Sequence, residues 1–202
     1  MANTQSQFGF RHNGYVSGSA SDMQLNSYRI QSTLATKIGF GDPVQRVSAT
    51  SLYITQATSG ASGNNLPIIG IFQGCQFTPS SGIQIPTWAP SWQAPSTNSD
   101  AIGYVIDAPG ATFLVASFQT SVSTADIGKA INFTTGTPSA VGGQFATATV
   151  DQATATSNVT ATFMPFKVYG LYEGVGNGSD PTTNFGWCVV TFNNAQWKVL
   201  NS

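Results

Sequence analysis

The side chains that could perform acid–base or nucleophilic chemistry are few and scattered along this sequence. The chain contains one histidine (His12), one glutamate (Glu173), seven aspartates and two cysteines. General acid–base catalysis requires such groups to lie close together around a substrate. The sequence has no pair of neighbouring carboxylates, no His-x-x-x-His, no Gly-x-Ser-x-Gly and no phosphate-binding glycine loop. We therefore predict that the protein is not an enzyme and that it has no catalytic residue, no metal ligand and no cofactor.

Most of the aspartates stand in contexts that are typical of turns. Asp42 lies between a glycine and a proline, Asp107 precedes Ala-Pro-Gly, and Asp180 precedes a proline. An aspartate side chain accepts hydrogen bonds from nearby backbone N–H groups, so it favours such positions. We expect these residues to shape turns. The single histidine, His12, lies in a polar stretch near the start of the chain, where we expect it to be solvated.

The two cysteines, Cys75 and Cys188, lie within apolar segments. A free cysteine in such a segment behaves as a small hydrophobic residue, so we expect two buried thiols. A disulfide between them is the alternative if their strands are adjacent. The first residues of the chain do not show a basic segment followed by an apolar one, so the sequence does not indicate export to an oxidising compartment.

The overall composition is unusually poor in charge. Of the 202 residues, 41% are hydrophobic and only 7% are charged, with a net charge of −1, whereas soluble domains carry roughly 25% charged residues. Seven lysines and arginines cannot supply the basic surface that binds phosphates, so nucleic acid is not an expected partner. No apolar run is long enough to span a membrane. Uncharged polar groups can be buried at an interface when they are hydrogen-bonded, so this composition favours a protein that assembles with copies of itself or with neighbours.

Strand-like segments recur at short intervals along the chain, separated by Gly, Pro, Asn and Ser. Several alternate apolar and polar residues with a period of two, which is typical of half-buried strands. The expected strands cover residues 44–47, 51–55, 66–72, 82–86, 102–106, 112–118, 130–134, 145–150, 159–168 and 188–192. Helical periodicity is confined to a turn or two within 20–34 and one turn at 126–128. We predict an all-β protein, an antiparallel β-barrel or β-sandwich of many short strands with an extended N-terminal arm and long loops.

Two segments are candidates for contacts with a partner. Residues 1–27 are polar with spaced larger side chains, which predicts an extended arm ordered by what it touches; a frayed terminus is the alternative. The remainder, 28–202, is expected to be a single β-rich domain, and deletion of the arm is expected to leave it folded. A proline-rich loop at 86–95 carries two tryptophans that either plug the barrel end or contact a partner. The candidate contact residues are Phe8, Phe10, Arg11, Tyr15, Met23, Trp88 and Trp92.

Four segments resemble the head decoration (cement) proteins of tailed bacteriophages. They are 37–44 (KIGFGDPV), 69–78 (IGIFQGCQFT), 100–109 (DAIGYVIDAP) and 189–194 (VVTFNN). The resemblance implies a structural virion protein that binds the exterior of a phage head and stabilises contacts between capsomers. It also implies that the partners are the major capsid protein and further copies of this chain, as a homotrimer or a dimer. The N-terminal arm would then add a strand to a neighbouring subunit.

Two other functions stay open on the sequence alone. One is a receptor- or glycan-binding β module of a phage tail or an adhesin, which would use Trp88, Trp92 and tyrosines on a glycan. The other is a coat subunit that forms the shell itself. The position of the polypeptide in a virion would separate all three.

Overall fold

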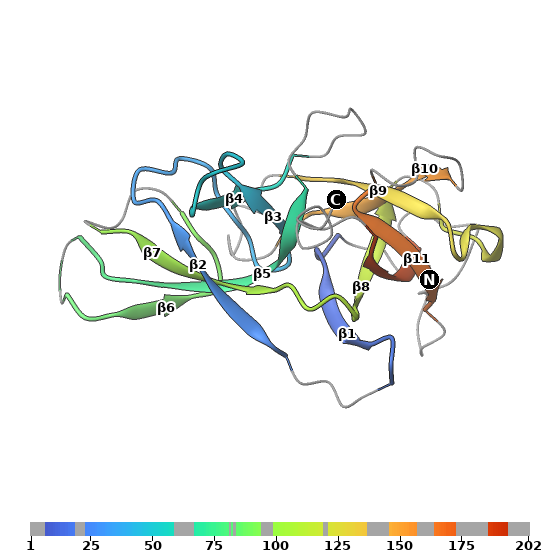
Figure 1. The fold of residues 1–202 in the computed structure, drawn as a ribbon, viewed down its shortest axis with the longest axis horizontal. Helices are drawn as coiled ribbons and strands as arrows, with labels where there is room; N and C mark the ends of the chain where they lie inside the picture. Colours follow the sequence, from blue (N-terminus) through green and yellow to red (C-terminus); the bar gives the residue numbers. More distant parts are fainter. Residues whose placement is uncertain are drawn as a thin grey trace, which may run out of the picture.

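The structure, a computed structural model, is all-β, as the sequence predicts, and its strands form two units that lie side by side (Figure 1). One unit is a closed five-stranded barrel with one additional strand, and the other is a second antiparallel sheet. The structure describes residues 7–18, 23–58, 67–80, 82, 84–93, 99–118, 121–136, 146–156, 164–172 and 186–193.

The barrel is closed by the pairing of its first strand with its last. The strand order is β8-β10-β9-β11-β12, and β12 pairs again with β8, where Val190 lies opposite Phe113. The β10–β8 pair is parallel and the other pairs are antiparallel. A further strand, β1, lies along β8, with Arg11 opposite Leu114. The bounds are β1 Arg11–Tyr15, β8 Ala111–Phe118, β9 Ala130–Thr134, β10 Thr149–Thr156, β11 Phe166–Leu171 and β12 Trp187–Phe192.

The second sheet has the order β2-β7-β5-β3-β4, and the short strand β6 also pairs with β5. A bridge between Arg29 and Tyr53 brings β2 next to the start of β4, so the sheet curls back toward itself around its own core. Fully buried side chains of that core include Phe72 and Trp92. The bounds are β2 Leu25–Ile30, β3 Pro43–Arg46, β4 Ile54–Gln56, β5 Ile68–Phe77, β6 Thr87–Ala89 and β7 Ala101–Ile106.

The predicted turn around Asp42 connects the two units. The Gly41 N–H donates to the carbonyl of Phe72 in β5 at 2.8 Å, and the Phe10 N–H donates to the Gly41 carbonyl at 2.9 Å. The Asp42 carboxylate accepts from the Gly39 N–H at 2.7 Å and from Gln56 Nε2 at 3.0 Å. Asp42 therefore shapes a turn, as predicted, and this turn joins the start of β1 to the second sheet.

The N-terminal segment differs from the extended arm expected over 1–27. Phe10 is fully buried in the barrel core, where its ring stacks on Phe166 with centroids 4.5 Å apart. Residues 11–15 form β1, and β2 begins at Leu25, so the expected boundary at 27/28 falls inside a strand. The physical reason is that burial of an aromatic ring together with strand pairing stabilises this polar segment on the barrel.

Three local expectations can also be compared with the structure. Residues 25–30 form β2, where the sequence favoured a helical turn within 20–34. The proline-rich loop contributes β6 at its start, because Trp88 pairs with Gln76 of β5. The short 3₁₀ helix η1 (Thr124–Asp126) lies next to the single turn expected at 126–128. Isolated polar or proline-rich segments carry weak strand signals, and pairing with a neighbouring strand decides their conformation.

Candidate functional site

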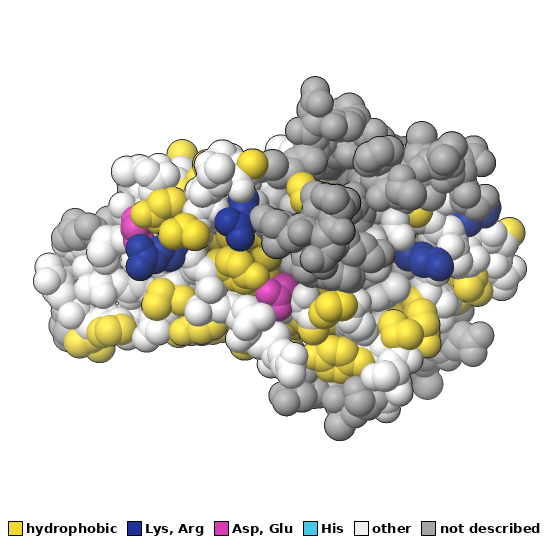
Figure 2. Space-filling view, viewed as in Figure 1, with side chains coloured by type: hydrophobic (Ala, Val, Ile, Leu, Met, Phe, Trp, Pro, Cys, Tyr) yellow, Lys and Arg dark blue, Asp and Glu magenta, His cyan; other side chains and the backbone are white. Residues whose placement is uncertain are grey.

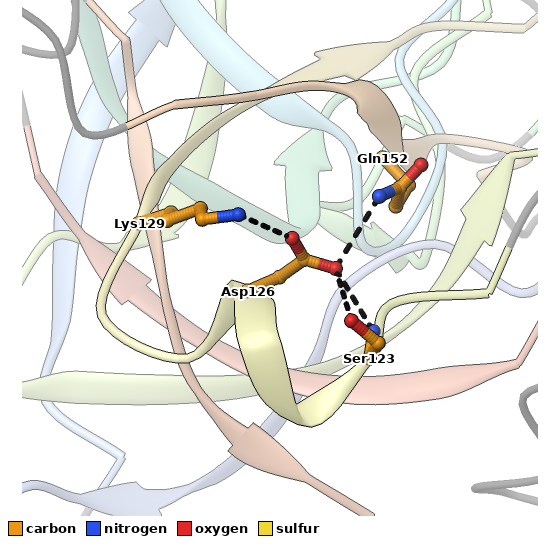
Figure 3. Close-up of polar contacts among 4 residues, drawn as sticks. All are labelled: Ser123, Asp126, Lys129 and Gln152. Carbon is orange, nitrogen blue, oxygen red and sulfur yellow. Dashed lines mark hydrogen bonds and ion pairs between the residues drawn. The ribbon is translucent and has the colours of Figure 1, made fainter.

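Asp126 is the best-connected carboxylate among the described residues (Figure 3). Its Oδ2 accepts from the backbone N–H of Ser123 at 3.0 Å, from the Ser123 hydroxyl at 2.9 Å and from Gln152 Nε2 at 3.3 Å. Its Oδ1 lies 2.9 Å from Lys129 Nζ. Burial opposes ionisation of this carboxyl, but these hydrogen bonds outweigh it and lower the pKa to about 2. Both oxygens are occupied, so Asp126 fastens η1 to β10 and is not available as a base.

Two other titratable groups of the described residues, His12 and Asp42, are at least partly buried and have shifted pKa values. His12 packs between the rings of Tyr15 and Phe113, with centroids 5.4 and 6.1 Å away, so it is half-buried where the sequence predicted a solvated residue. Burial lowers its pKa. Burial also raises the pKa of Asp42 to about 7. Within the described ranges, no three His, Cys, Asp or Glu side chains are placed to hold a metal ion. Glu173 lies outside the described residues.

The two cysteines are free and buried, so the disulfide alternative is wrong. Cys75 belongs to the core of the second sheet and Cys188 to the core of the barrel. Their thiols lie 3.6 Å from the Ser91 carbonyl and 3.8 Å from the Val115 carbonyl, respectively. Burial raises the pKa of both thiols to about 12, so neither is a reactive thiolate at neutral pH.

Two hollows lined by described residues of the second sheet and its flanks are candidate binding surfaces. The larger has a volume of about 470 Å³, and we call it the aromatic groove. Its lining residues are Met23, Leu25, Phe40, Gln73, Gln76, Trp88 and Tyr104. The register of β5, β6 and β7 places Gln76, Trp88 and Tyr104 on the open face of this sheet.

Trp88 is the most exposed ring of the groove, with 57% of its surface exposed. A bulge in β5 makes room for it at Gly74, which has a φ of +129°. A Cβ at this position would lie 2.7 Å from Trp88 Cζ2 and 2.9 Å from the Ala89 carbonyl oxygen. Glycine is therefore required, because it accepts this backbone conformation and lets the indole lie against the strand.

Two amide side chains supply the polar groups of the groove. Gln73 is only 6% exposed, and its Nε2 has no hydrogen-bond partner among the described residues. Gln76 Oε1 accepts from the Tyr104 hydroxyl at 3.1 Å. None of the described residues that line the groove is charged. A cation lies beside one of the lining rings: the guanidinium carbon of Arg11 is 4.8 Å from the centre of the Phe40 ring.

The smaller hollow, of about 280 Å³, lies beside the hairpin between β3 and β4. We call its lining the hairpin surface: Ser27, Tyr28, Arg29, Arg46 and Leu52. Leu52 is 69% exposed at the hairpin tip. The tip is held by a bond from the Val47 N–H to the Tyr53 carbonyl at 2.9 Å and by one from Arg46 Nη1 to the Ser51 carbonyl at 2.9 Å. An exposed apolar anchor flanked by two arginines suits a protein partner.

The structure separates the seven residues that the sequence marked for partner contact. Met23 and Trp88 come together in the aromatic groove. Phe10 and Trp92 are buried in the two cores, and Trp92 Nε1 donates to the Leu34 carbonyl at 3.2 Å. The others line the N-terminal segment: Phe8 packs edge-on against Trp187 at 5.2 Å, Arg11 covers Phe40, and Tyr15 contacts His12. Phe10 is therefore a core residue and not a surface contact, and for Trp92 the structure favours the core alternative over the partner contact.

Sequence reasoning missed the groove amides Gln73 and Gln76 and the hairpin residue Leu52. Each lies in a segment that reads as an ordinary strand or turn, and only strand pairing brings them to their neighbours.

No protein-family model matches the chain, and no curated protein matches it. Helical structure in the described ranges is limited to η1, and none of it has the length and hydropathy of a membrane span.

Proposed function

We propose that the protein is a non-catalytic structural protein of a phage virion that binds the exterior of the head and stabilises contacts between capsomers. Its partners are the major capsid protein and further copies of itself, as a trimer or a dimer. The observation that carries this proposal is the hairpin surface, where Leu52 is presented on a hydrogen-bonded turn. A fixed anchor loses little conformational entropy on binding, which favours attachment.

The surface chemistry supports the same function. Figure 2 shows hydrophobic side chains spread among neutral polar ones, with isolated patches of positive and negative charge. Ten large apolar side chains of the described residues are exposed: Val16, Met23, Leu25, Val47, Leu52, Ile85, Trp88, Ile102, Ile127 and Tyr169. A surface of this kind can be buried against another protein without desolvating many charges. Many copies acting together on one shell would add avidity to modest individual contacts.

The proposal is tested by adding purified protein to expanded phage heads that lack it. We expect co-sedimentation with the heads and additional density on their outer surface by electron microscopy. Leu52→Asp should weaken head binding at least tenfold, because it places a charge in the apolar contact. Ile127→Asp is the matched control, since Ile127 is also exposed but follows η1 beside the barrel. Density at the tail would instead favour the receptor-binding alternative, and density forming the shell would identify a coat subunit.

A further inference from the structure

We infer that the aromatic groove is a binding site for a neutral saccharide. This inference does not depend on the proposed attachment to a head, because the groove and the hairpin surface share none of their described lining residues. Among the described lining residues, the three aromatic residues, the two amides and the lack of charge each restrict the chemistry of the ligand.

The aromatic residues supply flat apolar faces. Trp88 is held against Gly74 and remains more than half exposed, so its ring is fixed without being covered. Phe40 and Tyr104 line the same hollow. The C–H groups on one face of a pyranose ring carry a partial positive charge, and they pack favourably on the electron-rich face of an indole. A groove of about 470 Å³ accommodates a short oligosaccharide.

Gln73 indicates that the ligand must also accept hydrogen bonds. Its amide is more than nine-tenths buried and lines the groove, yet its Nε2 donor is unsatisfied by any described residue. Buried amide donors are normally satisfied, and a ligand oxygen that reaches this donor from the groove would satisfy it. An apolar peptide side chain in the same place would leave this donor without a bond.

The remaining polar groups match hydroxyls. The Tyr104 hydroxyl donates to Gln76 Oε1, which leaves the tyrosine oxygen free to accept a bond from a ligand and the Gln76 Nε2 free to donate one. Sugar hydroxyls both donate and accept, so they can satisfy donors and acceptors that lie next to each other. The described lining residues carry no charge, so they do not compensate a charge on the ligand, which favours neutral sugars over sialylated or phosphorylated ones.

The test is calorimetry and NMR titration of the full chain with four soluble neutral probes: maltohexaose, cellohexaose, hexa-N-acetylchitohexaose and a galactose hexamer. We expect at least one to bind with a Kd in the millimolar range or tighter and to shift the Trp88 indole resonance. Trp88→Ala should weaken binding at least tenfold, and Gln73→Met, which keeps the side-chain length without the amide, should weaken it severalfold. Tyr169→Ala removes an exposed aromatic residue of the barrel and should leave the Kd unchanged.

Three results would overturn the inference. They are absence of binding by all four probes, equal binding by wild type and Trp88→Ala, and binding of the hydrophobic, anionic dye 1-anilinonaphthalene-8-sulfonate at Trp88 that no probe displaces. The last result would identify an apolar docking site instead. Thermal melts of each variant establish that a lost signal reflects the site, and Trp88→Phe, which keeps a ring, should retain part of the affinity if Trp88→Ala does not fold.

Discussion

Replacing Phe10 with alanine tests whether the N-terminal segment is part of the barrel or an arm that serves only a partner. The Phe10 ring is fully buried, stacks on Phe166 with centroids 4.5 Å apart and meets Phe113 edge-on at 6.4 Å. Truncating a buried phenylalanine costs about 3–5 kcal/mol, because apolar contacts are lost and a cavity remains. In a chain of this size that cost lowers the melting temperature by about 2–4 °C per kcal/mol, or roughly 6–20 °C in total.

The measurement is thermal and urea unfolding of wild type, Phe10→Ala and Val16→Ala. Val16 follows β1 directly but is 45% exposed, so its truncation should change stability by less than about 0.5 kcal/mol. If the free energy of unfolding of Phe10→Ala is within about 1 kcal/mol of that of wild type, the N-terminal segment does not stabilise the barrel. The extended arm expected over 1–27 would then be the better description of this segment. If the loss is as large as the burial requires, removing 1–27 would unfold the protein, since it also removes β1.

Three further predictions concern single residues. Asp126→Asn should lower the free energy of unfolding by about 1 kcal/mol near neutral pH; the value is kept small because Lys129 is one-third exposed and solvent screens its ion pair. The folded pKa of Asp126 is about 2, so in urea titrations the wild type should lose this extra stability as the pH falls from about 4 to about 2. The pKa of Asp42 is shifted in the opposite direction, because burial raises it to about 7 in the folded protein. Wild-type stability should therefore decline as the pH rises from about 4 to 7, and thermal melts of Asp42→Asn across this range should not show that decline. A rise in wild-type stability over the same interval would contradict the burial argument. Gly74→Ala should cost about 1–3 kcal/mol because of its positive φ, and should displace Trp88, which fluorescence would detect as a shifted emission maximum; unchanged emission and stability would refute the close packing.

Part of the fold could be predicted because its determinants are local. The alternating and β-branched residues of 102–106 and 188–192 indicate strands directly, and the structure has β7 and β12 at those positions. The turn at Asp42 was also predictable, since a side chain that bonds its own backbone needs no distant partner. By contrast, β1 contains His12, Asn13 and Gly14, which carry no strand signal; this segment is a strand because β8, about a hundred residues later, pairs with it.

The candidate binding surfaces were largely beyond prediction. The sequence identifies Trp88 as a candidate contact residue, but Gln73 and Gln76 occur among many glutamines and have no distinguishing motif. Their significance arises from the β5 bulge and the pairing of β5 with β6 and β7, which gather them around one hollow. Strand register depends on contacts far apart in the chain, so a single sequence does not determine it.

Composition and periodicity by themselves determined an all-β chain with scarce charge, because these properties are sums over local residue types. Whether Trp88 and Trp92 are buried or exposed was decided only by the tertiary structure. They lie four residues apart in one proline-rich loop, yet one is 57% exposed and the other 1%. Trp92 packs edge-on against Phe77 and bonds the Leu34 carbonyl, whereas Trp88 lies opposite Gln76 on the open face of the sheet. Burial of a side chain is set by what the rest of the chain places around it, and that information is not contained in the side chain or its neighbours in sequence.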